Sequence, residues 1–184
     1  LITRLQERVS AMRAEGIYSH LSIYFPLWFT PKPGLDWLDG YDGNKNPFAA
    51  LYFNDRFEAK YNDWWLSLLT QKDAGTGKTL LEEPALMSVE IVNEDSYFFW
   101  TFSEANIPDP QMRLLEAQFG SWLGKKYGSP AQALAAWKGE RLKRDAPEEG
   151  RIAFRPLWNM CNDKSVRDQD TAAFLLESQR GFYQ

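Results

Sequence analysis

The order of helical and apolar segments in the first half of the chain is the feature that most restricts its fold. Residues 1–15 carry apolar side chains at helical spacing, and they are followed by Gly16, a residue type that commonly ends helices. Residues 17–25 form a short, nearly continuous apolar run that stops at Pro26, as is typical of a buried strand. Helix, glycine and buried strand in this order predict a parallel sheet covered by helices, which is an α/β fold.

The same order follows once more along the chain. After a long loop over 26–46, Asn46-Pro47 predicts the cap and first residue of a helix that continues to Thr70. A second apolar strand is predicted over 85–93. Because two parallel strands cannot bury both of their faces, we expect this region to be the middle of a larger α/β fold.

The second half of the chain is predicted to be mainly helical. Residues 110–127 have amphipathic spacing, and Ser129-Pro130 predicts the start of a short helix through Trp137. A charged stretch with Pro and Gly follows, and Ser165 then predicts the cap of a last helix.

Charge and hydrophobicity exclude two classes of partner. The net charge is −4 and the 21 basic residues form no basic stripe, so we expect no nucleic-acid partner. No apolar run approaches the roughly 18–20 residues that a membrane helix needs, so we expect no membrane partner. Because Leu1 is not an initiator Met and Gln184 falls within a helical pattern, we expect both ends to continue in a longer protein.

Cysteine and histidine are too few for several kinds of site. The only cysteine, Cys161, excludes an internal disulfide and a cysteine-zinc cluster. The only histidine, His20, excludes a site in which two histidines of this chain bind a metal. We therefore predict no metal and no cofactor. Two short segments resemble ligand loops only in part, and we interpret both as turns: Gly75–Thr79 for phosphate and Asp42–Asn46 for calcium.

The most informative motif is Asn93-Glu94, which directly follows the second predicted strand. At the carboxyl end of a parallel strand a carboxylate lies on the edge of the sheet where α/β barrels build their active sites. Asn-Glu in this position, within the helix–strand–helix–strand order, resembles the fourth strand of glycoside hydrolases of the large retaining barrel clan (clan A). Residues 1–184 would then be a partial (β/α)₈ TIM barrel in one domain, with residues 105–165 as a helical insertion.

The resemblance implies a retaining hydrolase that acts on β-linked oligo- or polysaccharides. Glu94 would be the general acid/base, and Asn93 would contact the 2-hydroxyl of the sugar. Retaining hydrolysis also requires a nucleophilic carboxylate, which the resemblance assigns to a later strand that this chain lacks. We therefore expect the isolated chain to be inactive, and to associate with copies of itself or with the missing barrel segments to cover its sheet edges.

Five further residues are predicted to bind the sugar, in a chain that is 15% aromatic. They lie on the first strand, beyond its end, or in the aromatic stretch after Glu94: His20, Tyr24, Trp28, Trp37 and Trp100. Flat rings can stack on the C–H face of a pyranose, although the same rings equally suit core packing. A hydrogen-bonded core histidine is the alternative for His20.

Two other functions fit the same residues. A non-catalytic carbohydrate-binding module would bind sugar through Trp28 or Trp37 and would hardly depend on Glu94. A structural or interaction domain would instead bury Trp28, Trp37 and Trp100, and no sugar would change its melting temperature.

Overall fold

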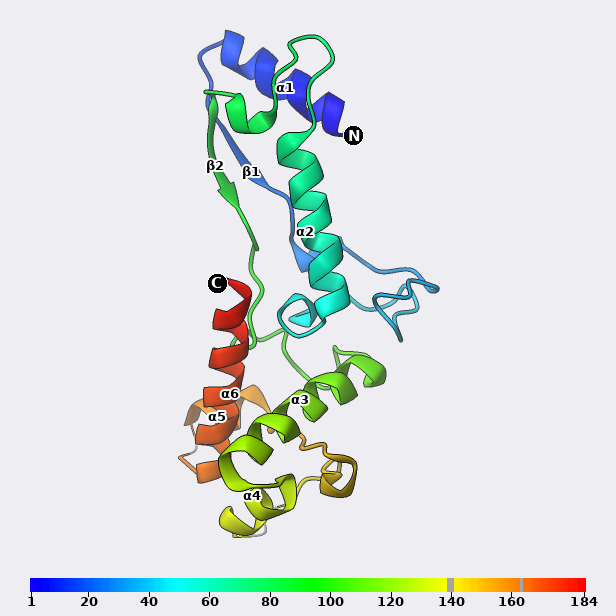
Figure 1. The fold of residues 1–184 in the computed structure, drawn as a ribbon, viewed down its shortest axis with the longest axis vertical. Coiled ribbons are helices and arrows are strands. Elements are labelled where there is room, and N and C mark those ends of the chain that lie inside the picture. Colours follow the sequence, from blue (N-terminus) through cyan, green and yellow to red (C-terminus); the bar gives the residue numbers. More distant parts are fainter. Residues whose placement is uncertain (139–140, 163) are drawn as a thin grey trace. The chain divides into compact units, whose positions relative to one another are not determined.

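The computed structural model describes residues 1–138, 141–162 and 164–184 (Figure 1). It is 50% helix and 6% strand, and the described residues contain a single two-stranded sheet. The predicted α/β fold, a partial (β/α)₈ barrel, is therefore wrong, because the described chain is mostly helical. The parallel relationship of the two predicted strands is confirmed, but the rest of the described chain packs as helices and supplies no further strand to such a sheet.

The chain divides into two compact units, which are described separately. Unit 1 consists of Leu1–Phe25 and Arg56–Glu94, and unit 2 consists of Pro26–Asp55 and Asp95–Gln184. That residues 1–184 form one domain with an insertion over 105–165 stays a prediction.

Unit 1 places a parallel strand pair against helices. Its elements are α1 (Ile2–Ala14), β1 (Ser19–Ser22), α2 (Asp55–Thr70, whose first residue belongs to unit 2), a 3₁₀ turn (Leu80–Glu82) and β2 (Leu86–Glu90). His20 pairs with Ser88 and Leu21 with Val89, both in parallel. The core of the unit is built by Val9, Leu21, Leu68 and Leu80. One strand, both helices and the 3₁₀ turn therefore contribute to one apolar cluster.

The end of α1 is the helix stop that the sequence predicts. Gly16 has a φ of 74°, a left-handed conformation that glycine adopts without a Cβ clash. Its amide donates to the carbonyl of Arg13, and the amide of Ile17 donates to that of Met12, each at 2.9 Å. These two bonds satisfy carbonyls that the helix leaves open and turn the chain toward β1.

The start of α2 differs from the prediction. The helix begins at Asp55, eight residues after Pro47, while its end at Thr70 is confirmed. Asn46 caps no helix, because its side-chain amide donates to the carbonyls of Pro26, Leu27 and Phe29. Those three bonds close the 26–46 loop, and a 3₁₀ turn over Ala50–Tyr52 follows before the helix.

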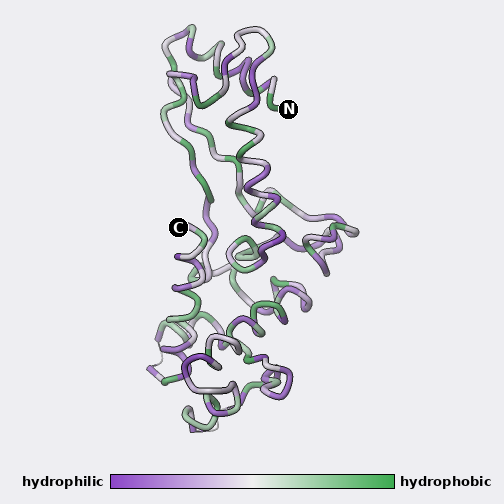
Figure 2. The backbone as a smooth tube through the Cα atoms, viewed as in Figure 1, coloured by the Kyte–Doolittle hydropathy of each residue, from purple (hydrophilic) through white to green (hydrophobic). Residues whose placement is uncertain are grey.

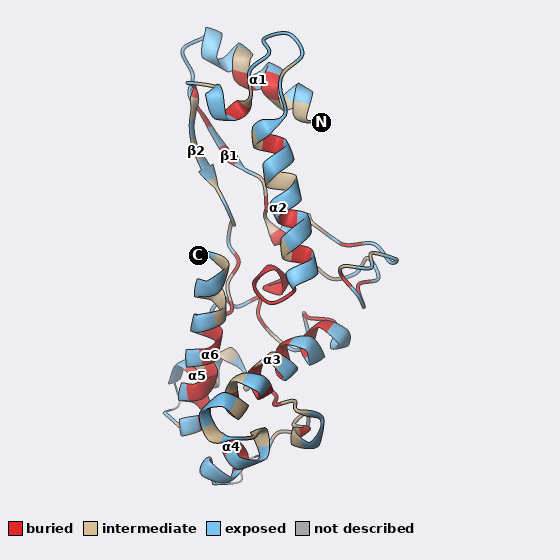
Figure 3. Ribbon diagram, viewed as in Figure 1, coloured by how far each residue is buried: buried red, intermediate tan, exposed pale blue. Residues whose placement is uncertain are grey.

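Unit 2 is a helical assembly around stacked aromatic rings. Its elements are short 3₁₀ turns at Pro26–Trp28, Ala50–Tyr52 and Pro147–Glu149, together with α3 (Asp109–Tyr127), α4 (Pro130–Ala136), α5 (Leu157–Asn162) and α6 (Val166–Phe182). The ring of Phe119 on α3 stacks on Phe154 and on Phe174 of α6, with centroids 5.2 and 5.1 Å apart. Figure 3 shows the buried positions of α3 and α6, and Figure 2 shows polar and apolar residues alternating along the helices.

Both predicted serine caps are confirmed. The side chain of Ser129 accepts a hydrogen bond from the amide of Gln132, and that of Ser165 accepts one from the amide of Asp168. Each bond satisfies an amide that the first turn of a helix leaves without a backbone partner. The N-termini of α4 and α6 are thus fixed by the residues that the sequence indicates.

A buried ion pair between Arg167 and Asp145 links α6 to the segment that precedes the Pro147–Glu149 turn. Arg167 and Asp145 are both fully buried at their side chains, and two hydrogen bonds of 2.7 and 2.9 Å join the guanidinium to the carboxylate. Asp145 also accepts the amides of Leu142 and Ala153. Burial alone would raise the pKa of Asp145, but these four donors outweigh it and hold the pKa below its ordinary value.

Candidate functional site

The chain around Glu94 is held in place by the elements of unit 1. After β2, the carbonyl of Ile91 accepts a hydrogen bond from the Tyr61 hydroxyl of α2. Two residues later the amide of Asn93 donates to the carbonyl of Tyr24, at 2.9 Å. The parallel pairing thus continues beyond the strands, and Asn93-Glu94 lies where both parallel segments end at their carboxyl side.

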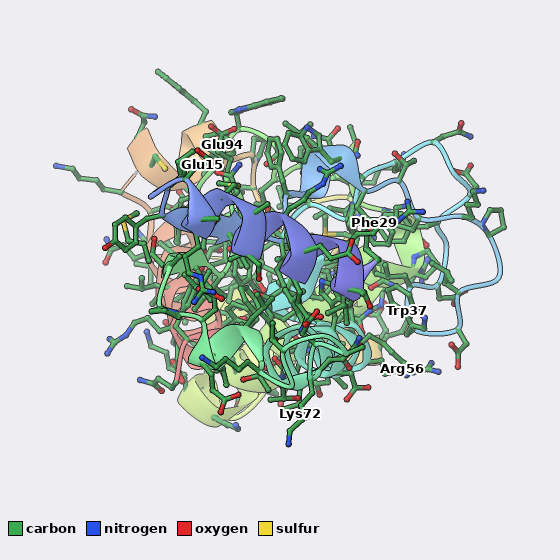
Figure 4. The ribbon with its side chains drawn as sticks, turned by 90° about the horizontal axis from the view of Figure 1, so that it is seen from above. Glu15, Phe29, Trp37, Arg56, Lys72 and Glu94 are labelled. Atoms are coloured by element: carbon green, nitrogen blue, oxygen red, sulfur yellow. The ribbon has the colours of Figure 1, made fainter. Side chains whose placement is uncertain are left out.

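Glu94 itself has an unusual backbone. Its φ is 48°, in the left-handed region that glutamate rarely adopts. Such a conformation costs on the order of 1–3 kcal/mol and persists only where the surroundings enforce it, which is common at functional sites. The residue is exposed, and its side chain is labelled in Figure 4. A carboxylate is therefore presented to solvent on a restrained backbone.

Asp95, the next residue, is the functional-site candidate that sequence reasoning missed. It belongs to unit 2, where it is buried, and both of its carboxylate oxygens accept the amide of Ala49 at 2.9 and 3.0 Å. The hydroxyl of Tyr52 donates to its carbonyl at 2.7 Å. Burial raises the pKa of Asp95 to about 7, and hydrogen bonds from the amides of Ala49 and Ser96 only partly oppose this. Its carboxyl group therefore titrates near neutral pH.

The raised pKa of Asp95 predicts an unusual pH dependence of stability. The unfolded chain has the ordinary value of 3.8, so the folded state holds the proton more tightly. The stabilisation is fully present below about pH 4 and is lost as the pH rises through about 7, a loss on the order of 4 kcal/mol. Urea unfolding between about pH 4 and pH 8 should show this fall. In the Asp95→Asn chain, whose side chain cannot ionise, the free energy of unfolding should change little over this pH range. An equal fall in that variant would contradict the prediction.

The residues predicted around Glu94 in unit 1 have different surroundings. His20 is exposed, and its Nδ1 lies 2.8 Å from the hydroxyl of Ser88 on β2, so the alternative of a core histidine is not what the structure shows. Tyr24 is only 7% exposed and packs edge-on against Phe57 and Tyr61. Its ring thus fixes the strand end against α2 and presents no open face for stacking.

The predicted tryptophans all lie in unit 2. Trp28 is 84% exposed and Trp100 is 67% exposed, so burial of these rings, which a purely structural role required, is not observed. Trp37 is half-buried and stacks on Phe29, with centroids 6.4 Å apart and the rings 15° from parallel. Figure 4 labels this pair on the 26–46 loop. Within unit 1, the predicted set thus brings together Tyr24, Asn93 and Glu94.

The two segments set aside as turns are confirmed as turns. Asp73 begins the first, because its carboxylate accepts the amides of Gly75 and Thr76 and its carbonyl accepts that of Gly77. In the second, Asp42 accepts the amide of Asn44. Both carboxylates have a lowered pKa, mainly because of these backbone donors.

Neither a metal cluster nor a membrane span is found in the described part of the chain. No group of three or more His, Cys, Asp or Glu side chains among the described residues could hold a metal ion. Within the same stretches, no helix combines the length and apolar composition that crossing a membrane would require.

Comparison with protein-family models, with curated proteins and with solved structures gives no match for this chain. The resemblance to glycoside hydrolases therefore rests on the sequence motif alone.

Proposed function

We propose that this chain contributes the acid/base carboxylate of a glycoside hydrolase that acts on β-linked oligo- or polysaccharides. The observation that carries the proposal is the position of Glu94, an exposed carboxylate on a left-handed backbone where two parallel segments end. Asn93 supports it, because the bond from its amide to Tyr24 fixes the residue that precedes the acid.

The chemistry gives Glu94 two successive roles. Its proton passes to the glycosidic oxygen while the bond from that oxygen to the sugar C1 breaks, and a second carboxylate forms a bond to C1. Glu94 then takes a proton from water as the water oxygen attacks C1 and releases the second carboxylate. That second group must stand roughly 5–5.5 Å from Glu94 for a retaining reaction.

We infer that association supplies this second carboxylate. The described sheet has two strands, so each strand has an open edge that can pair with another chain. Along β2 and just beyond it, alternate apolar side chains are exposed: Met87, Val89 and Ile91. An exposed apolar face beside an unpaired strand edge favours self-association over a stable monomer.

The test is hydrolysis of β-linked glycans measured against chain concentration. We expect specific activity to rise as the chain associates, as followed by analytical ultracentrifugation. Glu94→Ala should lower kcat/KM by about 10²–10⁴, because general acid–base assistance is lost. The loss should be smallest for dinitrophenyl glycosides, whose leaving group needs no proton, and azide should restore turnover by attacking the glycosyl-enzyme without a general base.

Glu7→Ala is the matched control, since Glu7 is an exposed carboxylate of unit 1 on α1. It should keep full activity. Absence of hydrolysis at every concentration would overturn the inference that self-association supplies the second carboxylate. Equal activity of the Glu94→Ala chain would overturn the assignment of Glu94 as the acid/base. Sugar affinity that depends on Trp28 or Trp37, in a chain that hydrolyses nothing, would identify a non-catalytic binding module instead.

A further inference from the structure

Unit 2 contains a pocket that none of the predicted catalytic residues lines. Its walls come from residues 102–105, from α3, and from the segment 154–157 that leads into α5, and Trp100 and Arg144 complete the lining. Its volume is about 380 Å³, which falls within the roughly 300–1,000 Å³ of small-molecule sites. The pocket is thus large enough for a compact organic ligand.

One side of the pocket is aromatic. Trp100 is 67% exposed although it lines the pocket, so its indole ring is accessible to a ligand. Phe102 and Phe154 also line the pocket and pack edge to face, with centroids 6.2 Å apart. Packed aromatic rings together with one accessible indole suit a ligand that has a flat C–H face.

The other side is polar and its charges are already matched. Arg144 donates to the buried carboxylate of Glu116 at 2.6 Å and to Asp109 at 2.7 Å, and Glu104 lies 3.8 Å from the same guanidinium. Arg155, the other cation of the lining, is paired with Asp168 at 2.7 Å. Each of these two cations therefore has an acidic partner, and an anionic ligand would have to displace one of the ion pairs at a large cost.

We propose that this pocket is a binding site for a neutral pyranose saccharide, separate from Glu94. Trp100 stacks on the apolar face of the sugar, while Glu104 and the outer edge of Arg144 accept and donate hydrogen bonds to its hydroxyls. A neutral pyranose is the ligand class that combines one flat apolar face with a rim of uncharged donors and acceptors. The ligand class follows from the chemistry of the pocket itself and not from the role of Glu94.

Isothermal titration calorimetry tests the proposal with cello-, xylo-, manno- and laminari-oligosaccharides, and with an oligogalacturonate as the charged comparison. At least one neutral saccharide should bind, and the oligogalacturonate should bind more weakly. Trp100→Ala should weaken the affinity by about tenfold or more. Its fold should be retained, because the ring is mostly exposed, and circular dichroism checks this.

Trp158→Ala is the matched control, since Trp158 is also an exposed tryptophan of unit 2 but does not line the pocket. It should leave the affinity within about twofold. Because Glu94 does not line the pocket, this proposal and the catalytic one can fail independently. Binding of none of the neutral saccharides, equal affinity in a folded Trp100→Ala chain, or tighter binding of the oligogalacturonate would overturn the pocket assignment.

Discussion

Asp145→Ala should destabilise unit 2 by about 3–5 kcal/mol, because it leaves the buried guanidinium of Arg167 without its carboxylate. Arg167 is 0% exposed, and after the substitution it keeps its contacts with the carbonyl of Ala153 and the ring of Trp137. The amides of Leu142 and Ala153 would lose their acceptor as well. Since natural domains have only about 5–15 kcal/mol of stability, this loss is a large part of the total.

Thermal unfolding followed by near-ultraviolet circular dichroism measures the effect. The expected decrease in Tm is about 6–20 °C for a chain of this size. Replacing both partners, Asp145→Ala with Arg167→Met, removes the unpaired charge and should recover much of the loss. If the Asp145→Ala chain melts within about 2 °C of the original chain, the ion pair is not needed for stability.

Gly120→Ala should be the second strongly destabilising change, by about 3 kcal/mol, because α3 meets backbone at this point. A Cβ at Gly120 would stand 1.8 Å from the carbonyl oxygen of Gly150 and 2.8 Å from its carbonyl carbon. A backbone carbonyl cannot rotate away as a flexible side chain can. The Pro147–Glu149 turn or α3 must therefore move, and the stacking of Phe119 beside it is disturbed.

Gly124→Ala is the matched control within the same helix. A Cβ at Gly124 meets nothing within 4 Å, so this change should stabilise α3 by up to about 1 kcal/mol through helix propensity. Urea unfolding of the two variants therefore gives shifts of opposite sign. Stabilisation by both variants would mean that helix propensity, and not contact with Gly150, decides the effect at Gly120.

Local signals in the sequence predicted much of the secondary structure. The helix stop at Gly16 and the caps at Ser129 and Ser165 are confirmed because each depends on residues within one turn. The helix over 110–127 is confirmed because its amphipathic spacing extends along the whole segment. The parallel strand pair is confirmed too, although the strands are shorter than predicted and cover only Ser19–Ser22 and Leu86–Glu90. Beyond them the pairing continues through the bond between Asn93 and Tyr24.

The errors come from long-range interactions. Asn46-Pro47 has the local pattern of a helix start. The side-chain amide of Asn46 instead donates hydrogen bonds to three carbonyls of the preceding loop. The barrel was predicted from element order, which does not determine how many strands pair. In the second half, aromatic residues around Phe119 join helices to one another, and a pattern of apolar residues does not distinguish that packing from helices on a sheet.

The candidate site divides in the same way. The placement of Asn93-Glu94 directly after a strand could be predicted, because it needs only the strand and the next residues. The burial of Asp95 could not be predicted, because its partner Ala49 lies 46 residues away in the sequence. Ala49 also has a left-handed φ of 57°, a conformation that an alanine in the sequence does not indicate. Exposure of Trp28 and Trp100 likewise depends on what the rest of the fold leaves uncovered.

The division of the chain into interleaved units governs how this protein can be made and cut. The backbone passes from one unit to the other at 25/26, 55/56 and 94/95, so each unit is assembled from two separate stretches. During synthesis unit 1 can be completed once residue 94 has emerged, whereas residues 26–55 must wait for α6, which packs on the Ala50–Tyr52 turn. No single continuous segment of the chain contains unit 2 without unit 1. A protease that cuts within 26–55 separates the two stretches of unit 1 and also divides unit 2 between the two fragments.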